Sequence, residues 1–534
     1  MICVSIGRGR HKQMIAEHQH LADQGAELVE LRLDYIRRDV SLARLLKDRP
    51  CPVVIACRRK EDGGKWAGTE QARRILLRSA IVDGADYVDL EEDIAGAIAR
   101  YGKTKRIVSY HNFNEFPEDL ERVHARMLTL DPDIVKVAVM GYHPGHNIRM
   151  LKLIRTSPVP TVGICMGDIG IPTRLLAGKF GAPFTYATFH HERALAPGQL
   201  SYRQMVETYG YDRIREDTEV FGVVADPIGH SLSPIIHNAA FRALNLNRVY
   251  IPFRVPEGEL DAFLHDCDLL DVKGLSVTIP HKEAALRALT SIEAAAREIG
   301  AVNTILIEGT ERRGYNTDYH AAIDSILRGV GEGDASNPLA GRIALVLGAG
   351  GVARAVAFGL RQRDVDVVVT NRTDERARYL AQQIGCRWVD WSTRHALKPH
   401  LLVNCTPVGM HPNVDETPYL RHYLRRQMVV FDTVYNPEQT LLIKEARRQG
   451  CRTVTGVDMF VRQAAMQFKL FTKQSPPIAL MVEQVRRAIG AARIETPIFG
   501  EADIEDQATV EANPPRTDGL SAVDGPDGEG ADDD

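Results

Sequence analysis

The chain lacks several features that define common classes of protein. No apolar run among its 534 residues approaches the roughly 20 residues that a membrane-spanning helix needs. The eight cysteines form no Cys-x-x-Cys pair and no His/Cys cluster, so we expect neither a disulfide framework nor a metal site. The basic residues form no stripe interleaved with aromatics, which argues against nucleic-acid binding. These absences favour a cytoplasmic protein with small-molecule ligands.

The chain also lacks a strong net charge, but its acidic and basic residues are unevenly distributed along the sequence. The formal charge is −4, yet residues 500–534 hold twelve acidic residues and a single Arg516. The rest carries 65 basic against 58 acidic residues, which is compatible with anionic ligands. Residues 495–534 are rich in Pro, Gly and Asp, so we predict an acidic disordered tail. The start, Met1–Gly7, is typical of a first strand rather than of a signal peptide.

A chain of this length exceeds what one core usually supports, and its first part repeats one pattern. Short apolar runs alternate with helix-length spacers, and eight such units fit in about 210 residues. This predicts a compact (β/α)8 barrel over residues 1–212; an open doubly wound sheet, which usually has fewer strands, is the alternative. The predicted strands are 2–6, 28–33, 53–57, 87–90, 106–110, 134–139, 161–165 and 184–188.

The second part predicts a two-domain α/β dehydrogenase. A substrate-binding domain is expected over residues 219–328, with strands at 220–225, 249–253 and 274–279 and a helix at 235–244. The glycine-rich stretch 329–341 leads to an apolar strand, 343–348, that opens a Rossmann-like NADP-binding domain over 339–472. Residues 473–494 are expected to form a helix that returns to the substrate domain.

Charged residues near the ends of the barrel strands predict a first active site. Lys136 lies within an apolar strand, where burial favours the neutral amine that can attack a carbonyl. His111 and Glu91 end neighbouring strands and should converge on it, since barrel sites lie at the carboxyl ends of strands. Side chains alternate along a strand, so three further charged residues lie on one side of the second strand. A bound ligand explains these charges better than an apolar barrel core does: Glu30, Arg32 and Asp34.

Seven motifs, in the family's order, resemble type I 3-dehydroquinate dehydratase over about residues 1–208. They are Leu31-Arg-Leu-Asp34, Glu61-Asp-Gly-Gly64, Asp89-Leu-Glu91, Ser109-Tyr-His-Asn-Phe113, Val135-Lys-Val-Ala138, Thr173-Arg-Leu175 and Ala196-Pro-Gly-Gln199. The resemblance implies that Lys136 forms an imine with the substrate's C3 ketone. His111 would move the C2 proton to the departing C1 hydroxyl, and Glu91 would orient His111. The resemblance also implies that Arg174 binds the substrate's carboxylate. The ring hydroxyls would be bound by Glu30, Arg58 and Gln199.

Two positions depart from that family's pattern. Leu195 stands where the family usually has Ser or Thr before Ala-Pro-Gly-Gln, so one hydroxyl contact of the closing loop is missing. Ala56-Cys57-Arg58 replaces a frequent Thr-x-Arg but keeps the arginine. Neither change touches the acid–base residues, so we still expect activity.

A glycine loop predicts dinucleotide binding in the second part. It follows a strand and opens an Ala-rich helix, the context in which backbone approaches a pyrophosphate, and comprises Gly348, Ala349, Gly350, Gly351, Val352 and Ala353. The next strand ends in Asn371-Arg372-Thr373, without the acidic residue of NAD sites. A polar residue followed by arginine favours the 2′-phosphate of NADP.

Other residues of the second part predict a substrate site. Ser231 and Ser233 lie at a helix start, with Ser233 expected as the N-cap, where hydroxyls can bind a carboxylate; simple capping would explain only one serine. Lys282 and Asp318 could bind a substrate hydroxyl and supply a proton as hydride arrives, although a salt bridge is the simpler explanation.

Motifs over about residues 219–490 resemble shikimate dehydrogenase. They are Pro227–Pro234, Ser276–Lys282, Gly300–Thr304, Gly314–Asp318, Asn404–Met410 with Thr406, Asp432–Pro437, and Gln463 in Val461–Ala465. The resemblance implies that Lys282 and Asp318 are the catalytic pair. It implies that the carboxylate is bound by Ser231, Ser233 and Tyr435, and that the ring is surrounded by Thr278, Lys282, Asn303, Asp318 and Gln463.

Together the two resemblances predict a bifunctional enzyme of the shikimate pathway, a monomer or homodimer, with NADP(H) as its cofactor. It would dehydrate 3-dehydroquinate to 3-dehydroshikimate and reduce that product to shikimate. Two alternatives remain: quinate oxidation with NAD, against which Arg372 argues, and a sensing or scaffold protein that binds these metabolites without turnover.

Overall fold

The computed structural model describes residues 1–229, 231–331 and 337–494. Residues Met1–Ile489 form one compact unit, and a second unit begins at Gly490. The predicted disordered tail, 495–534, lies outside the described residues. Within the described ranges, no helix is long and apolar enough to cross a membrane.

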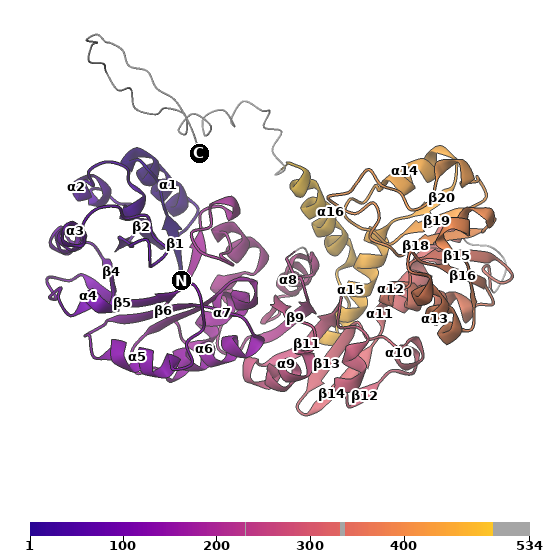
Figure 1. Ribbon diagram of the computed structural model, residues 1–534, viewed down its shortest axis with the longest axis horizontal. Helices are drawn as coiled ribbons and strands as arrows, with labels where there is room; N and C mark the ends of the chain where they lie inside the picture. The colour runs from indigo at the N-terminus through magenta and orange to yellow at the C-terminus, as the bar shows by residue number, and fades with distance from the viewer. Residues whose placement is uncertain (230, 332–336, 495–534) are drawn as a thin grey trace, which may run out of the picture. The chain divides into compact units, whose positions relative to one another are not determined.

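The first eight strands form one parallel sheet that curls into a barrel (Figure 1). They are β1 (Ile2–Ile6), β2 (Leu28–Arg32), β3 (Val53–Ala56), β4 (Tyr87–Glu91), β5 (Lys105–Asn112), β6 (Ile134–Met140), β7 (Thr161–Met166) and β8 (Thr185–Thr188). Consecutive strands from β1 to β7 are hydrogen-bonded neighbours, and β8 returns to pair with β1. The ladder does not join β7 to β8 in the described residues, so the barrel is nearly closed. The barrel therefore confirms the predicted fold and excludes the open-sheet alternative.

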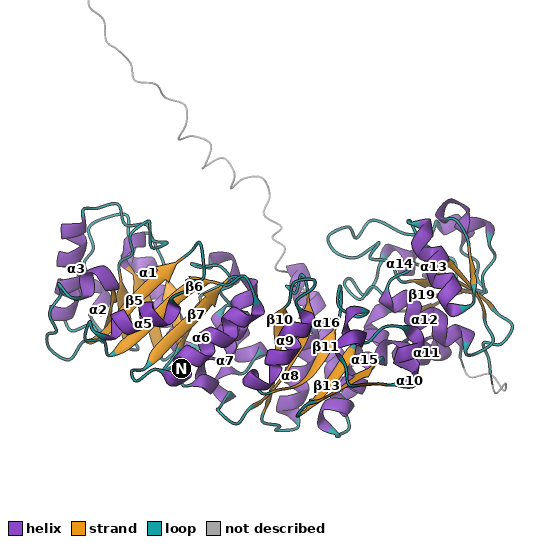
Figure 2. Ribbon diagram, turned by 60° about the horizontal axis from the view of Figure 1, so that its bottom comes forward, coloured by secondary structure: helices purple, strands orange, loops and turns teal. Residues whose placement is uncertain are grey.

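Helices cover the outside of this barrel (Figures 1 and 2). They are α1 (His11–Asp23), α2 (Leu42–Leu46), α3 (Glu70–Val82), α4 (Glu92–Ala95), α5 (Leu120–Leu128), α6 (Pro144–Thr156) and α7 (Ile171–Leu176). Their apolar faces pack on strands that are buried throughout, such as β1 and β2, because helices shield the outer side of a parallel sheet. This packing leaves the carboxyl ends of the strands for chemistry.

A six-stranded mixed sheet follows, in the order β10-β9-β11-β13-β14-β12. Its strands are β9 (Glu219–Ala225), β10 (Arg248–Arg254), β11 (Val272–Val277), β12 (Ser291–Ile292), β13 (Thr304–Glu308) and β14 (Glu311–Tyr315). Its helices are α8 (Ser233–Ala243), α9 (Leu260–Asp266), α10 (Ala294–Ile299) and α11 (Thr317–Val330). Strands β9, β10 and β11 are parallel, and their carboxyl ends lead into the predicted substrate residues.

The third sheet is parallel throughout, in the order β17-β16-β15-β18-β19-β20. It contains β15 (Ile343–Leu347), β16 (Asp366–Thr370), β17 (Arg387–Trp388), β18 (Leu401–Asn404), β19 (Val429–Asp432) and β20 (Arg452–Val454). Helices α12 (Gly351–Arg361), α13 (Asp374–Ile384), α14 (Leu441–Arg448), α15 (Gly456–Thr472) and α16 (Ile478–Ile494) accompany it. In chain order this is 3-2-1-4-5-6, the Rossmann arrangement, in which ligands bind where the order reverses.

Two local expectations need correction. Helix α8 begins at Ser233 and its N-cap position is Leu232, so Ser233 lies in the first turn and does not cap it. The Oγ of Ser231 instead accepts a hydrogen bond from the backbone N–H of Ser233 at 3.3 Å. Strand β5 runs on to Asn112, two residues beyond the predicted end at 110, and His111 lies at its carboxyl end as expected.

Candidate active sites

The carboxyl ends of the barrel strands enclose a small cavity of about 50 Å³. Seven of the residues predicted for this site line it: Glu30, Arg32, Arg58, His111, Lys136, Arg174 and Gln199. They come from different strands and loops, so the barrel brings them together as its topology predicts. Glu91 is absent from the lining.

Lys136 is held in this cavity by two carboxylates and an aromatic ring. Its side chain on β6 is 6% exposed, and Nζ lies 3.1 Å from Asp89 Oδ2 and 3.4 Å from Glu30 Oε1. The ring centroid of Tyr186 lies 3.8 Å from Nζ, a close cation–π contact. The carboxylates offset the cost of burying an ammonium group and fix Nζ at the cavity.

The two carboxylates remain ionised although both are buried. Burial raises the pKa of Asp89, but Arg58 and Lys136 lower it by more, so the net shift is strongly downward. Burial likewise raises the pKa of Glu30, and Lys136, Arg58 and Arg32 reverse that shift. Glu30 also accepts a hydrogen bond from Ser5 Oγ at 2.8 Å. Both groups are therefore negative charges facing the lysine at neutral pH.

His111 is a neutral imidazole in this environment. Burial lowers its pKa well below the usual value, and the cations Arg58 and Lys136 lower it further. Its Nδ1 lies 3.2 Å from Arg58 Nη1, and a guanidinium can only donate, so Nδ1 accepts. The ring proton therefore lies on Nε2, and Arg58 must release Nδ1 before that nitrogen can take a proton.

The structure does not bring Glu91 to His111. No hydrogen bond joins the two in the described ranges; Glu91 Oε2 instead accepts from Arg73 Nη1 at 2.6 Å. Its Oε1 lies 3.5 Å from Arg58 Nη1, the group that also contacts His111. Arg73 is fully buried on α3 and binds the carboxylate of Glu91, the last residue of β4. Glu91 thus reaches His111 only through Arg58.

Among the cations that line the cavity, Arg174 is the one with no carboxylate partner in the described residues. It is 1% exposed on α7, donates from Nη2 to the carbonyl oxygen of Pro197 at 3.0 Å, and its Nε has no partner in the residues described. Burial lowers its pKa to about 10, and nearby Cys165 offsets little of this. A buried guanidinium without a counter-ion is costly, so this position is suited to an anionic ligand.

The closing loop, residues 195–199, lies over the same cavity. Gln199 Oε1 accepts from the backbone N–H of Leu195 at 2.8 Å, which folds the loop on itself. Gly198 has φ of 68°, and a Cβ there would lie 2.3 Å from the carbonyl oxygen of Gly167. Only glycine therefore permits this close approach.

Sequence reasoning missed three residues around this cavity: Asp62, Asp89 and Tyr186. Asp89 belonged to a motif already singled out, and its alternation with Glu91 could have identified it. Tyr186, on β8, belonged to a run that predicts only a buried strand. Its exposed fraction is 3%, and its hydroxyl has no hydrogen-bond partner in the described part of the chain.

A second cavity of about 420 Å³ contains all the substrate residues predicted for the second part. Those that line it are Ser231, Ser233, Thr278, Lys282, Asn303, Asp318, Tyr435 and Gln463. Lys282 Nζ donates to Asp318 Oδ2 at 2.5 Å, and both side chains are nearly buried. The two predicted partners therefore meet inside a cavity rather than on the surface.

Hydrogen bonds fix the floor of this second cavity. Ser276 Oγ accepts from the Tyr250 hydroxyl at 2.6 Å and donates to Gln467 Oε1 at 2.7 Å. Gln467 Nε2 donates to the Asn303 carbonyl at 3.2 Å, and Asn303 Oδ1 accepts from the backbone N–H of Thr317 at 2.8 Å. Sequence reasoning missed Gln467, which follows Gln463 by one helical turn on α15 and lines the same cavity.

The predicted nucleotide loop connects β15 to α12. Gly348 has φ of 111°, and a Cβ there would lie 2.9 Å from the Cys405 carbonyl oxygen. A Cβ on Gly350, the N-cap of α12, would meet nothing within 4 Å, so a phosphate can approach this backbone. Thr406 Oγ1 donates to Asn404 Oδ1 at 2.7 Å, which orders the loop after β18.

The end of β16 fits a phosphorylated ribose. Asn371 Nδ2 donates to the Thr373 carbonyl at 2.9 Å, and Arg372 is exposed beside it. Within the described ranges, no carboxylate pairs with Arg372 or with Arg376 one turn further on. These two cations are therefore available to a 2′-phosphate.

The fold and the two sites define an enzyme class: a barrel lyase built around a buried lysine, joined to a nicotinamide-dependent dehydrogenase. Residues 2–216 match the type I 3-dehydroquinase family, and 223–305 match the shikimate dehydrogenase substrate-binding domain. Residues 334–401 match the shikimate/quinate 5-dehydrogenase family, and 456–486 match the shikimate 5′-dehydrogenase C-terminal domain.

Relatives agree with these matches. The chain is 38% identical over 89% of its length to the chloroplastic bifunctional 3-dehydroquinate dehydratase/shikimate dehydrogenase of Arabidopsis thaliana, and covers 83% of that protein. Half of it is 38% identical to the NADP(+) shikimate dehydrogenase of Methanothermobacter thermautotrophicus, covering 97% of that protein. Shikimate 5-dehydrogenase from Thermus thermophilus, solved with NADP(H) and shikimate, is 37% identical over 51% of this chain and 99% of its own, with a TM-score of 0.46.

The chain belongs to the family of bifunctional 3-dehydroquinate dehydratase/shikimate dehydrogenases. It is thus an enzyme with two activities, a lyase and an oxidoreductase, as the sequence predicts.

Proposed function

We propose that residues 1–212 dehydrate 3-dehydroquinate and that residues 219–494 reduce the resulting 3-dehydroshikimate to shikimate with NADPH. Within the second part, 219–328 would bind substrate, 339–472 would bind the cofactor, and 473–494 would return to the substrate domain. The observation that carries the proposal is the pair of buried lysines, Lys136 and Lys282, each in its own cavity with a carboxylate partner.

In the barrel, Lys136 first loses its ammonium proton to water. The neutral amine then attacks the C3 ketone and water leaves, which forms an imine. The positive imine nitrogen draws electrons from C2, so its proton becomes acidic. His111 takes that proton once Arg58 turns from its Nδ1 to the ligand, and then gives it to the C1 hydroxyl, which leaves as water. Hydrolysis of the imine releases the product and restores Lys136.

Other barrel residues bind and position. Arg174 holds the carboxylate because it is the buried cation without a counter-ion. Glu30, Arg32 and Gln199 bind the ring hydroxyls, and Arg58 both binds the ring and holds His111. Glu91 positions Arg58 through an ion pair, and Asp89 holds Lys136 in place in the same way.

In the second cavity, NADPH supplies the hydride when it is bound. Lys282 and Asp318 bind the reacting oxygen, and Lys282 supplies the proton that turns the ketone oxygen into a hydroxyl. Ser231, Ser233 and Tyr435 bind the carboxylate, while Thr278, Asn303 and Gln463 surround the ring. Arg372 with Asn371 and Thr373 selects the 2′-phosphate, which favours this assignment over NAD-dependent quinate oxidation.

We infer a reducing compartment, the cytoplasm, because all eight cysteines are unpaired. The predicted monomer or homodimer stays a prediction, which sedimentation of the purified protein would measure.

The first test gives the purified protein 3-dehydroquinate and NADPH, with mass analysis of the products. NADPH oxidation with shikimate formed supports both halves. A product lighter by one water without NADPH oxidation overturns the reductase assignment. Unchanged 3-dehydroquinate overturns the role of Lys136, and bound ligand without turnover favours a sensing protein.

A further inference from the structure

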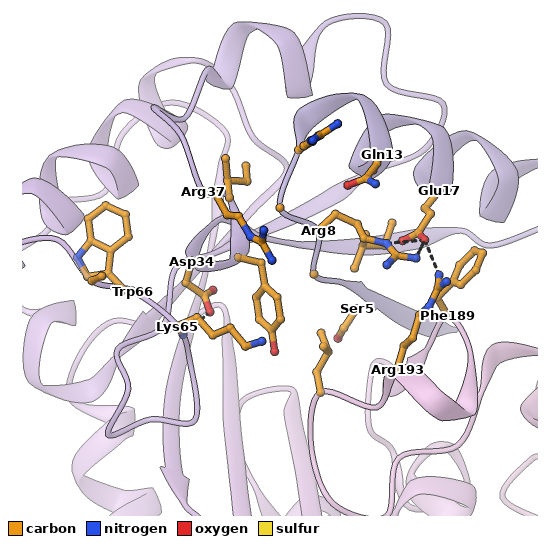
Figure 3. Close-up of a pocket in the computed structure, with 18 of the residues that line it drawn as sticks. Ser5, Arg8, Gln13, Glu17, Asp34, Arg37, Lys65, Trp66, Phe189 and Arg193 are labelled. Carbon is orange, nitrogen blue, oxygen red and sulfur yellow. Dashed lines mark hydrogen bonds and ion pairs between the residues drawn. The ribbon is translucent and has the colours of Figure 1, made fainter. Parts of the chain in front are cut away.

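A hollow of about 1030 Å³ lies beside the catalytic cavity of the barrel (Figure 3). Its walls are residues 5–10 at the end of β1, Gln13 and Glu17 on α1, and residues 34–37, 65–68, 189 and 193–195. Ser5 and Leu195 line both this hollow and the catalytic cavity, so the two spaces are neighbours. Nothing in the two proposed reactions uses it.

Glycines in the loop after β1 shape the hollow. A Cβ on Gly7 would lie 2.9 Å from the Tyr35 ring, and one on Gly9 would lie 3.3 Å from Arg37 Nε. Their lack of side chains lets Tyr35 and Arg37 pack against the loop, where the backbone N–H of Arg37 donates to the Gly9 carbonyl at 3.2 Å. Lys65 Nζ lies 4.5 Å from the Tyr35 ring centroid. These contacts hold two cations at one wall.

The charge in this hollow is unbalanced. Five cations line it (Arg8, Arg10, Arg37, Lys65 and Arg193) against two carboxylates, Glu17 and Asp34. Figure 3 shows Arg37 and Lys65 on one side, and Arg8, Glu17 and Arg193 together on the other. An excess of positive charge in a concave surface concentrates the field and attracts anions.

Both carboxylates are already occupied. Glu17 accepts from Arg8 Nε at 2.7 Å and from Arg193 Nη1 at 3.1 Å. Asp34 accepts from Arg32 at 2.9 Å through both oxygens, and from the backbone N–H of Lys65 at 2.9 Å. In the part of the chain that the structure describes, no carboxylate pairs with Arg10, Arg37 or Lys65. Three cations therefore face a shared space without a counter-ion.

We propose that this hollow is a second anion-binding site, which takes a small molecule with two or more carboxylate or phosphate groups. Arg37 and Lys65 bind one end of the ligand and Arg10 adds charge. Leu195, which also lines the hollow, belongs to the loop that carries Gln199 into the catalytic cavity. A bound polyanion therefore contacts the mouth of the catalytic cavity and slows dehydration.

The test is calorimetric titration of the full-length enzyme with citrate and, separately, with pyrophosphate, which carries two phosphate groups. One set of samples has the catalytic cavity filled by borohydride reduction of the imine on Lys136. The filled enzyme should still bind one equivalent of polyanion. The variant Arg37→Gln/Lys65→Gln should bind it about 25-fold more weakly, since each exposed ion pair contributes up to about fivefold. Arg38→Gln removes an equally exposed charge that does not line the hollow and should bind as the parent does.

The outcomes separate this site from the dehydratase site. Equal affinity of the double variant and Arg38→Gln, or no binding to the filled enzyme, overturns the proposal. Failure of borohydride to trap an adduct counts against the imine on Lys136, whereas the comparison of variants in untreated enzyme still decides the second site. Binding of citrate but not pyrophosphate identifies a polycarboxylate ligand, and the reverse identifies a ligand with two or more phosphate groups. Citrate inhibition of dehydration should weaken in the double variant with kcat unchanged.

Discussion

Individual side chains in the barrel cavity are coupled through charge. Arg58 contacts His111, Asp89, Glu30 and Glu91, so the protonation of the histidine depends on an arginine that also faces the ligand. The same cations that keep the carboxylates ionised keep the imidazole neutral. This arrangement makes His111 a base at neutral pH although no hydrogen bond joins it to a carboxylate in the described residues.

Arg58→Gln should change the pH profile of dehydration. The neutral form of His111 takes the proton, so activity falls as pH falls through its lowered pKa. Burial remains in the variant but one cation is gone, so the pKa of His111 rises and the acidic limb of kcat moves to higher pH. The measurement is kcat between pH 5 and about 8. An acidic limb that stays in place, or moves down, would contradict the proposed coupling.

Tyr186 should act through its ring rather than its hydroxyl. Tyr186→Phe keeps the cation–π contact with Lys136 and should retain kcat within about threefold, whereas Tyr186→Leu should lose about tenfold. The yield of the borohydride-trapped adduct should follow the same order. A larger loss in the Phe variant than in the Leu variant would assign the role to the hydroxyl.

Whether a functional residue could be predicted depended on whether the local sequence or a tertiary contact determines its role. Lys136 stood out because a charge within an apolar run needs a compensating partner or a ligand. Arg174 was predicted only through the family resemblance, and that Lys282 meets Asp318 could not be read from the sequence. The partner itself was harder to predict. Asp89 and Glu91 lie on the same side of β4, and the choice between them rests on Arg73, whose approach from α3 is a tertiary contact that no local pattern contains.

At the scale of elements, loops after strands carry the ligand-binding groups, and their backbone shape matters as much as their side chains. The loop 195–199 is the clearest example, since it contacts Gly167 through a backbone hydrogen bond from Gly167 N–H to the Pro197 carbonyl at 3.2 Å. Arg174 donates to the same carbonyl.

Gly198→Ala should therefore impair dehydration without unfolding the barrel. The new Cβ would clash with the Gly167 carbonyl oxygen and would sit at an unfavourable positive φ, so the loop must shift away from Arg174 and Gln199. A displacement near 1 Å costs about a hundredfold in kcat/KM. Gly181→Ala, with φ of 98° but nothing within 4 Å of its Cβ, is the control for backbone strain alone. Equal losses in the two variants would refute a loop displacement.

Asp432, the last residue of β19, should make the second half of the chain less stable as pH rises. Burial raises the pKa of Asp432 from 3.8 to about 6, against hydrogen bonds from Thr440, Val434 and Asn404 that lower it. A raised folded-state pKa means that the folded state binds the proton more tightly. Stability is therefore highest below pH 3.8 for this group and falls by about 3 kcal/mol as pH rises through 6.

Asp432→Asn should remove that pH dependence. Urea unfolding between pH 4 and about 7, followed by the fluorescence of Trp388 and Trp391 in the same sheet region, measures it. The exposed pair of Asp366 with Arg387 provides the control variant Asp366→Asn. A slope unchanged by Asp432→Asn would show that another group titrates.

Element positions were predictable because buried parallel strands are continuous apolar runs, and all eight barrel strands were found within two residues of their ends. The starts of helices were less predictable from the sequence. At α8 the pattern Ser-Leu-Ser-Pro offers two serines for the cap, and the chain uses neither at the cap position. The hollow beside the catalytic cavity was not predictable, since it joins residues 5–10, 34–37, 65–68, 189 and 193–195 that only the barrel assembles.

At the scale of the whole molecule, the two activities belong to separate sheets and should be separable. Lys136→Ala should abolish dehydration and leave the reduction of added 3-dehydroshikimate unchanged, because Lys282 and Asp318 lie in another cavity. Lys282→Ala should do the reverse. NADPH oxidation and product mass, measured with each substrate alone, check both variants. Loss of both activities in either variant would indicate that the halves depend on each other.

The unpaired Arg174 also links the supply of substrate to the lifetime of the protein. Without a ligand, the barrel carries a buried positive charge that lacks a counter-ion; with one, the free energy of unfolding increases by about 2.7 kcal/mol at a hundredfold excess over Kd. A cell starved of the precursor would hold a larger unfolded fraction of this chain, which proteases remove. Flux through the pathway would then set the abundance of its own enzyme, with no transcriptional signal required.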